Sequence, residues 1–242
     1  IGSKRDALLI STYAVALRKE AASRILNEGV MRRISLLSTT VHEVFRVLPP
    51  ETSTIPDDRS VQLATIFLQA NIFNTFGLLD CWAHIWRNEF NILGKNGKSI
   101  PKSRIGLGKH CVELRASLTP KLNELLESRD EWIQRISSLR HSLAHQIPPY
   151  IPPHMVDPSN EHVYRALLAR WFNTLDPEER EELDARMRSV SHFKSWLIYD
   201  LEQSPPIAFH AQLIVDFLTI EEISHGFIFG IRERSKERSR YK

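Results

Sequence analysis

The stretch from about residue 58 to residue 90 limits most strongly what this chain can fold into. Apolar residues recur in it at spacings of three and four, as they do along one face of an α-helix. The series is Ile72, Phe76, Leu79, Ala83, Trp86 and Phe90, and it is widened by Phe73, Trp82 and Ile85. A helix that is apolar over so much of its circumference must be covered on several sides. We therefore predict that it is the central helix of a bundle.

Proline and capping residues divide the rest of the chain into further predicted helices. Proline cannot continue a helix, and it pushes the residue before it out of α geometry. Asp, Asn, Ser and Thr are the usual caps of a helix N-terminus. These signals predict a first helix over about residues 3–48, with a break near Gly29, and a second that begins at Asp57 or Asp58 and ends before a loop over residues 93–108. A further helix begins at about Lys109, and another extends over residues 120–146. The last three begin at Ser159 or Asn160 and end at Phe172, begin at Asp176 and Pro177, and begin at Ser204 and Pro205 and end at about Arg234.

No segment shows the alternation of apolar and polar residues that is typical of a half-buried strand. The predicted fold class is therefore all-α, a multi-helix up-and-down bundle with additional C-terminal helices. A chain of 242 residues is long enough to bury a core that needs no metal or disulfide. We predict a single helical domain with a core over about residues 1–155, a helical C-terminal extension over about 156–231 and a basic tail over 232–242.

The two cysteines, Cys81 and Cys111, lie in apolar helical patterns and form no C-x-x-C motif. This usage is typical of buried thiols in a reducing compartment. The longest apolar stretch near the N-terminus, residues 7–17, is interrupted by Ser11 and Thr12 and is far too short to span a bilayer. We therefore expect a cytoplasmic protein with no membrane partner.

The formal net charge of +3 is unevenly distributed. Residues 232–242 contain six Lys and Arg against two Glu, a net of +4, so the rest of the chain carries about −1 (3 − 4). We interpret this tail as the solvated end of a helix. Its alternative role is to steer the protein toward RNA or an acidic partner.

Two short patterns resemble sites for nucleotides or metals. Residues 94–99, Gly-Lys-Asn-Gly-Lys-Ser, resemble the tip of a phosphate-binding P-loop, but that motif requires a glycine where Ile92 stands and a strand before it. His141 and His145 have a spacing that zinc sites on helices use, but a third ligand is missing unless His154 folds back. We therefore predict no nucleotide hydrolysis, no metal and no other cofactor.

Two further patterns have ordinary structural interpretations. A polar stripe runs along the central helix and consists of Asp80, His84, Arg87 and Asn91. We interpret it as solvated or paired side chains, with a catalytic role as the alternative. The segment Pro149-x-x-Pro152 fits a polyproline ligand, but a rigid connector that covers a helix end is the simpler interpretation.

Residues 140–153 carry the most specific functional signal. They read Arg-His-Ser-Leu-Ala-His-Gln-Ile-Pro-Pro-Tyr-Ile-Pro-Pro, so Arg140 and His145 fall in the last turns of a predicted helix, directly before a forced stop. This segment resembles the R-x(4–6)-H motif of the HEPN superfamily, in which a polar residue such as His141 often follows the arginine. Residues 70–80 of the central helix also resemble uncharacterised bacterial HEPN-like proteins. The stretch after residue 155 matches no part of the superfamily core.

The resemblance implies metal-independent RNA cleavage, in which the ribose 2′-hydroxyl attacks the adjacent phosphate and leaves a 2′,3′-cyclic phosphate. His145 would be the general base or acid, because a histidine exists in both protonation states near neutral pH. Arg140 would hold the phosphate and stabilise the charge of the transition state. His141 would orient the substrate or share in proton transfer.

Helix geometry makes one copy of this motif a poor catalytic pair. At about 100° per residue, Arg140 and His145 lie about 140° apart around an ideal helix. The histidines are expected to face away from the buried stripe and Arg140 to lie on its flank. The stripe consists of Trp132, Ile136, Leu139 and Leu143. The resemblance to the superfamily implies a homodimer in which two motifs meet across one cleft, and this layout is compatible with that.

The leading functional hypothesis is a HEPN-type endoribonuclease of a bacterial toxin, defence or stress system, with RNA as substrate and an antitoxin or other protein as partner. The alternative is a non-catalytic HEPN-like module that binds RNA, a nucleotide or a protein. The two differ in whether Arg140, His141 and His145 perform chemistry, since a helical bundle hosts many activities.

Overall fold

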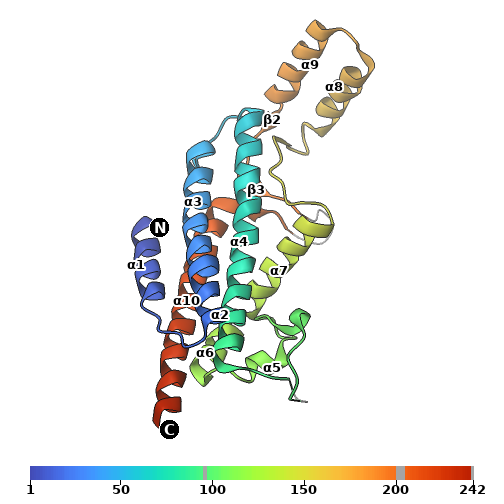
Figure 1. The fold of residues 1–242 in the computed structure, drawn as a ribbon. Coiled ribbons are helices and arrows are strands. Elements are labelled where there is room, and N and C mark those ends of the chain that lie inside the picture. The colour runs from blue at the N-terminus through green and yellow to red at the C-terminus, as the bar shows by residue number, and fades with distance from the viewer. Residues whose placement is uncertain (95–96, 200–204, 241–242) are drawn as a thin grey trace.

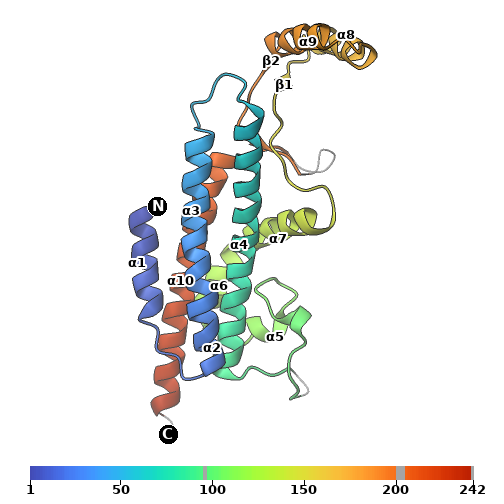
Figure 2. The same ribbon diagram turned by 45° about the horizontal axis from the view of Figure 1, so that its top comes forward.

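The computed structural model describes residues 1–94, 97–199 and 205–240, which form an elongated helical bundle (Figure 1). The bundle contains α1 (Gly2–Tyr13), α2 (Glu20–Arg24), the π-helix η1 (Ile25–Val30), α3 (Met31–Val47), α4 (Asp58–Phe90), the 3-10 helix η2 (Lys102–Arg104), α5 (Val112–Arg115), α6 (Pro120–Ser128), α7 (Asp130–His145) and α10 (Phe209–Arg240). A hairpin of α8 (Glu161–Asn173) and α9 (Pro177–Ser189) projects from one end of it (Figure 2). The predicted all-α multi-helix bundle is confirmed.

In the described residues, two antiparallel pairs of two-residue strands accompany the helices, although the sequence predicted no strand. The first pairs β1 (Met155–Val156) with β2 (Ser191–His192), at the base of the hairpin. The second pairs β3 (Trp196–Leu197) with β4 (Ile207–Ala208), directly before α10. Strands of two residues are too short to produce an alternating pattern, so hydrophobic periodicity could not have predicted them.

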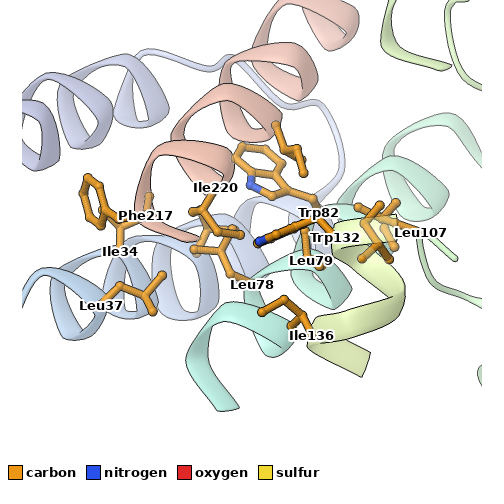
Figure 3. Close-up of a cluster of buried hydrophobic side chains, with 14 of the residues drawn as sticks. Ile34, Leu37, Leu78, Leu79, Trp82, Leu107, Trp132, Ile136, Phe217 and Ile220 are labelled. Carbon is orange, nitrogen blue, oxygen red and sulfur yellow. The ribbon is translucent and has the colours of Figure 1, made fainter. Parts of the chain in front are cut away.

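The central position predicted for residues 58–90 is confirmed, because α4 packs against α3, α7 and α10. Figure 3 shows side chains from these helices converging around Trp82. The Trp82 ring is fully buried and stacks on Phe227, and its Nε1–H donates to Ser224 Oγ at 2.9 Å. The indole thus buries a large apolar surface and leaves no donor unpaired.

The N-terminal boundary of α4 follows its sequence signal. The carboxylate of Asp57 caps the helix by accepting from the Ser60 backbone N–H at 2.9 Å. At the other end Asn91 adopts the left-handed conformation, with φ of 52°. Asn tolerates this conformation better than most residues, so the helix ends there.

Several helix boundaries differ from the predictions. Residues 3–48 form several helices: they separate between Tyr13 and Glu20, and near Gly29 the chain widens into the π-helix η1 without a break. Residues 120–146 form two helices, because the chain turns at Arg129 so that α6 packs on α10 and α7 on α4. The last helix begins at Phe209, after β4, and not at Pro205; Ser204 lies outside the described residues.

The separation before α2 depends on a contact that is remote in sequence. Glu89 of α4 is buried, and its carboxylate accepts the backbone N–H groups of Arg18 and Lys19 at 3.0–3.1 Å. These N–H groups lie at the start of α2, where a negative charge is favoured. No local signal in residues 14–19 could have predicted this cap.

Residues 156–231, grouped above as one C-terminal extension, divide into two structurally different parts. The hairpin has its own small core of Leu167, Leu183 and Met187. Helix α10, in contrast, belongs to the main core, to which it contributes side chains from Phe209 to Ile231. The main bundle therefore contains both the N-terminal helices and the last helix of the described chain.

The basic tail continues α10, and part of it packs on the bundle. The Arg234 guanidinium lies 4.7 Å from the centroid of the Phe90 ring and donates to the Ser117 carbonyl oxygen. Arg238 donates to the Phe90 carbonyl oxygen at 3.0 Å. The interpretation of residues 232–242 as a solvated helix end therefore fails for these two arginines; Tyr241 and Lys242 lie outside the described residues.

None of the helices in the described ranges combines the length and the apolar composition that crossing a bilayer requires. The two cysteines are free thiols, Cys111 buried and Cys81 half-buried. Burial raises the pKa of both thiols.

A buried carboxylate makes the stability of the bundle depend on pH. Asp216 of α10 is 5% exposed and accepts from Trp132 Nε1 at 2.7 Å and from Gln212. Burial raises the pKa of Asp216 to about 6, because its effect is larger than the opposing effects of these hydrogen bonds and of the nearby Arg135. A raised carboxyl pKa means that the folded state holds its proton up to a higher pH than the unfolded state, so this group lowers stability as pH rises from about 4 to about 6.

Asp216→Asn is accordingly expected to raise the free energy of unfolding at pH 7.5 by up to about 3 kcal/mol, with no gain near pH 4. Asparagine can still accept from Trp132 but carries no charge to bury. Urea unfolding at both pH values measures the effect, and Asp184→Asn, at an exposed position on α9, is the control. Equal destabilisation by Asp216→Asn at both pH values would show that the carboxyl group acts through its hydrogen bonds and shape, independently of its charge, and would contradict this prediction.

Candidate functional site

Arg140 is fixed between the last turns of α7 and the middle of α4. Its side chain is half-buried, and its guanidinium lies 5.5 Å from the centroid of the Phe76 ring. An arginine over an aromatic face is held by a cation–π attraction that restricts its orientation. The first residue of the predicted motif is therefore positioned by the central helix.

Asp80 lies one turn beyond Phe76 on α4, on the same face as the Arg140 contact. Burial raises the pKa of its carboxyl to about 6, and the positive charges of Arg140 and Arg33 oppose this rise. Among the described residues Asp80 has no hydrogen-bond or ion-pair partner. A half-buried carboxylate under the electrostatic influence of two arginines is thus available to a ligand.

Arg33 is a member of this cluster that the sequence analysis missed. It comes from α3 and donates to Asn74 Oδ1 at 3.0 Å. A Cβ on Gly77 would lie 2.5 Å from its Cζ, so this glycine is what allows the guanidinium to lie against α4. Residues 33 and 80 are far apart in the sequence, and no sequence motif contains both, so their proximity could not be predicted.

The two histidines of the motif lie at the open end of α7. Both side chains are exposed, and their ring centroids are 5.1 Å apart. The prediction that they face away from the buried stripe, with Arg140 on its flank, is confirmed. Among the described residues no three His, Cys, Asp or Glu side chains group as a metal site would need, so the His141 and His145 pair gains no third ligand there.

The proline segment after α7 is a fixed connector. Ser142 Oγ donates to the Ile147 carbonyl oxygen at 2.7 Å, and Gln69 of α4 donates to the Pro149 carbonyl oxygen at 2.9 Å. Tyr150 exchanges both backbone hydrogen bonds with Ile198, each at 2.9 Å. Pro149 and Pro152 are buried, so the interpretation as a connector is confirmed and the polyproline ligand is excluded.

In the rest of the polar stripe on α4, Arg87 makes local hydrogen bonds. Arg87 donates to Ser99 Oγ at 2.6 Å and to Asn88 Oδ1 at 2.8 Å. Burial, followed by the charges of Arg87 and Lys102, lowers the pKa of His84. Asn91 ends the helix, as described above. Of the four stripe residues, only Asp80 joins the Arg140 cluster.

The segment that resembles a P-loop follows a helix, whereas the motif follows a strand. A bridge pairs Leu93 with Ser99, and Gly97 adopts a φ of 71° within the turn that they close. Lys95 and Asn96 lie outside the described residues. The described part of the segment is a hairpin-like turn and not a phosphate-binding loop.

His154, which could have completed a metal site, points elsewhere. Its Nε2 lies 2.8 Å from the hydroxyl of Tyr164 on α8. Burial, followed by the charge of Arg188, lowers the pKa of His154. Its contacts are therefore with the projecting hairpin and not with the histidines of α7.

A pocket of about 470 Å³ opens beside the Arg140 cluster. Its walls come from α4, α7 and residues 102–111, and they include the apolar side chains of Phe76, Ile105, Leu107 and Ile133. Asp80 lies in its wall, and its lining also includes the exposed residues Lys102, Lys109 and His110. Apolar walls with a few polar groups and a perturbed carboxylate are typical of a ligand site.

Comparison of this chain with models of protein families, with curated proteins and with solved structures finds no match. The function must therefore be inferred from the side chains and from the motif resemblance alone.

Proposed function

We propose that this protein is a metal-independent endoribonuclease of the HEPN type. The observation that carries the proposal is the arrangement at the end of α7: Arg140 is held on Phe76 beside Asp80, whereas His141 and His145 project into solvent from the next two turns. A fixed guanidinium and exposed imidazoles are the groups that transesterification of RNA requires.

In the proposed reaction His145 removes the proton of the ribose 2′-hydroxyl as its oxygen attacks phosphorus. The bond to the 5′-oxygen breaks, and a histidine returns a proton to that oxygen. Arg140 binds the nonbridging oxygens, which carry the charge of the transition state. Its contact with Phe76 supports this role, because an arginine that is already ordered loses little conformational freedom when it binds.

The proposed enzyme acts as a homodimer. Arg140 lies on the flank of α7 and contacts α4, whereas His145 points to solvent, so a single chain offers no common face for one phosphate. An exposed apolar surface adjoins Arg140: Phe73 is 45% exposed one turn before Phe76, and Leu36 is 48% exposed one turn after Arg33. Large exposed apolar side chains beside an incomplete site favour a dimer in which a second copy of the chain covers this surface.

A bacterial toxin, defence or stress system is the proposed setting, with an antitoxin or other protein as partner. An unregulated ribonuclease is harmful to its host, so its activity must be restrained. Toxicity on overexpression in bacteria, relieved by a change at His145, is the cellular result that this setting predicts.

The direct test is incubation of the purified protein with mixed RNA in EDTA, followed by analysis of the product ends. We expect cleavage that leaves 2′,3′-cyclic phosphates and 5′-hydroxyls, because the 2′-oxygen is the nucleophile. DNA, which lacks this hydroxyl, is the control substrate and is expected to remain intact. Failure of a folded, dimeric protein to cleave RNA would instead favour the non-catalytic binding module.

A further inference from the structure

The pocket beside Arg140 contains a carboxylate with no hydrogen-bond or ion-pair partner among the described residues. Asp80 lies in the wall among Phe76, Leu79 and Ile105, and no described residue donates a hydrogen bond to it. The other carboxylate in the lining, Asp130, is already neutralised by an ion pair with Arg115 and by Lys109 at 3.7 Å. Of the two carboxylates in the lining, Asp80 is therefore the one that can accept hydrogen bonds from a ligand.

An ionised carboxylate only accepts hydrogen bonds, and its two oxygens can accept from two parallel donors. Guanine presents two adjacent donors, N1–H and the N2 amino group, along its Watson–Crick edge. Adenine and cytosine present one amino donor beside a ring acceptor, and uracil presents one donor between two carbonyl oxygens. Only guanine among the four RNA bases therefore satisfies both oxygens without placing an acceptor against them.

The remainder of the pocket suits a nucleotide. Single-stranded RNA is commonly recognised by bases that leave the stack, lie against aromatic or apolar side chains and form hydrogen bonds along their edges. Phe76, Ile105 and Ile133 provide such surfaces. Lys102 and Lys109 line the same pocket, are exposed and carry the charge that attracts a phosphate.

We propose that this pocket binds a guanine nucleotide, with Asp80 accepting from the N1–H and N2 amino groups of the base and Lys102 attracting the phosphate. If the ribonuclease proposal is correct, the guanine is a base of the RNA substrate, and its pocket adjoins the arginine that holds the phosphate. Only this link to cleavage rests on the proposed function, since binding of the free nucleotide does not require catalysis.

The test is a calorimetric titration of the full chain with GMP, AMP, CMP and UMP. We expect GMP to bind roughly tenfold or more tightly than the other three, which is the discrimination typical of one bidentate pair. Asp80→Asn should remove this preference, because an amide presents one donor and one acceptor where guanine presents two donors. Thermal unfolding of the variant verifies that it remains folded.

Lys102→Ala is the matched control from the same pocket. This substitution should weaken the binding of all four nucleotides by a similar factor and leave the preference for guanine intact, since it removes a phosphate contact and not a base contact. Equal binding of the four nucleotides by the wild type, no binding of GMP at millimolar concentration, or retained guanine preference in Asp80→Asn would each overturn the proposal. Guanine binding without RNA cleavage would support the pocket and reject the ribonuclease, so the two proposals fail separately.

Discussion

Replacing His145 by alanine is expected to reduce RNA cleavage by a factor on the order of 10² to 10⁴, the contribution typical of a positioned general acid or base. The imidazole is exposed at the end of α7, so its removal leaves no cavity and breaks no buried contact. The free energy of unfolding should therefore change little. Rates measured in EDTA on one defined RNA, together with a urea unfolding curve, provide both quantities.

His162→Ala is the matched control, because His162 is also an exposed histidine on a helix but belongs to the projecting hairpin. It should leave the cleavage rate within a factor of about two, as a surface change away from the site does. The cleavage rate of His141→Ala should lie between those of His145→Ala and His162→Ala, since the His141 ring lies 5.1 Å from that of His145 and can share in proton transfer. Full activity of His145→Ala would remove this residue from the mechanism.

Mixing two inactive variants, Arg140→Ala and His145→Ala, is expected to restore cleavage. If each site takes Arg140 from one protomer and His145 from its partner, a mixed dimer has one site with both residues and one site with neither. Random exchange makes about half of the dimers mixed, so the activity should recover to about a quarter of the wild-type value. Neither variant alone can form such a site.

The experiment requires subunits that exchange, which co-expression of the two variants with different tags ensures. The double variant, which carries Arg140→Ala and His145→Ala in the same chain and is measured alone, provides the inactive reference. No recovery in purified mixed dimers would mean that Arg140 and His145 act within one chain. The proposal would then need a conformational change that brings Arg140 from Phe76 to the histidines.

Much of the fold was accessible from sequence because its signals are local. The apolar stripe of residues 72–90 predicted the central helix, and Asp57 and Pro148 marked helix ends that the structure confirms. The exposed positions of His141 and His145 followed from helical periodicity alone. Each of these conclusions needs only a few neighbouring residues.

The predictions that were wrong concern features that depend on contacts between residues distant in the sequence. The separation before α2 depends on Glu89, more than sixty residues away, as the cap at Arg18 and Lys19 shows. Helices α6 and α7 separate at Arg129 without proline or glycine, because each packs on a different partner. Helix α10 joined the main core although its sequence position suggested an extension. Contacts remote in sequence override local propensity in each case.

The helical class, the central helix and the position of the motif at the end of α7 could be predicted from sequence, because hydrophobic periodicity, proline and capping act over a few residues. The packing of the helices, in contrast, places Arg140 on Phe76, brings Arg33 and Asp80 to the same cluster and forms the pocket beside them. These side chains come from three helices that are distant in the chain. Their meeting depends on how the helices pack, and packing is a property of the whole core and not of any segment within it.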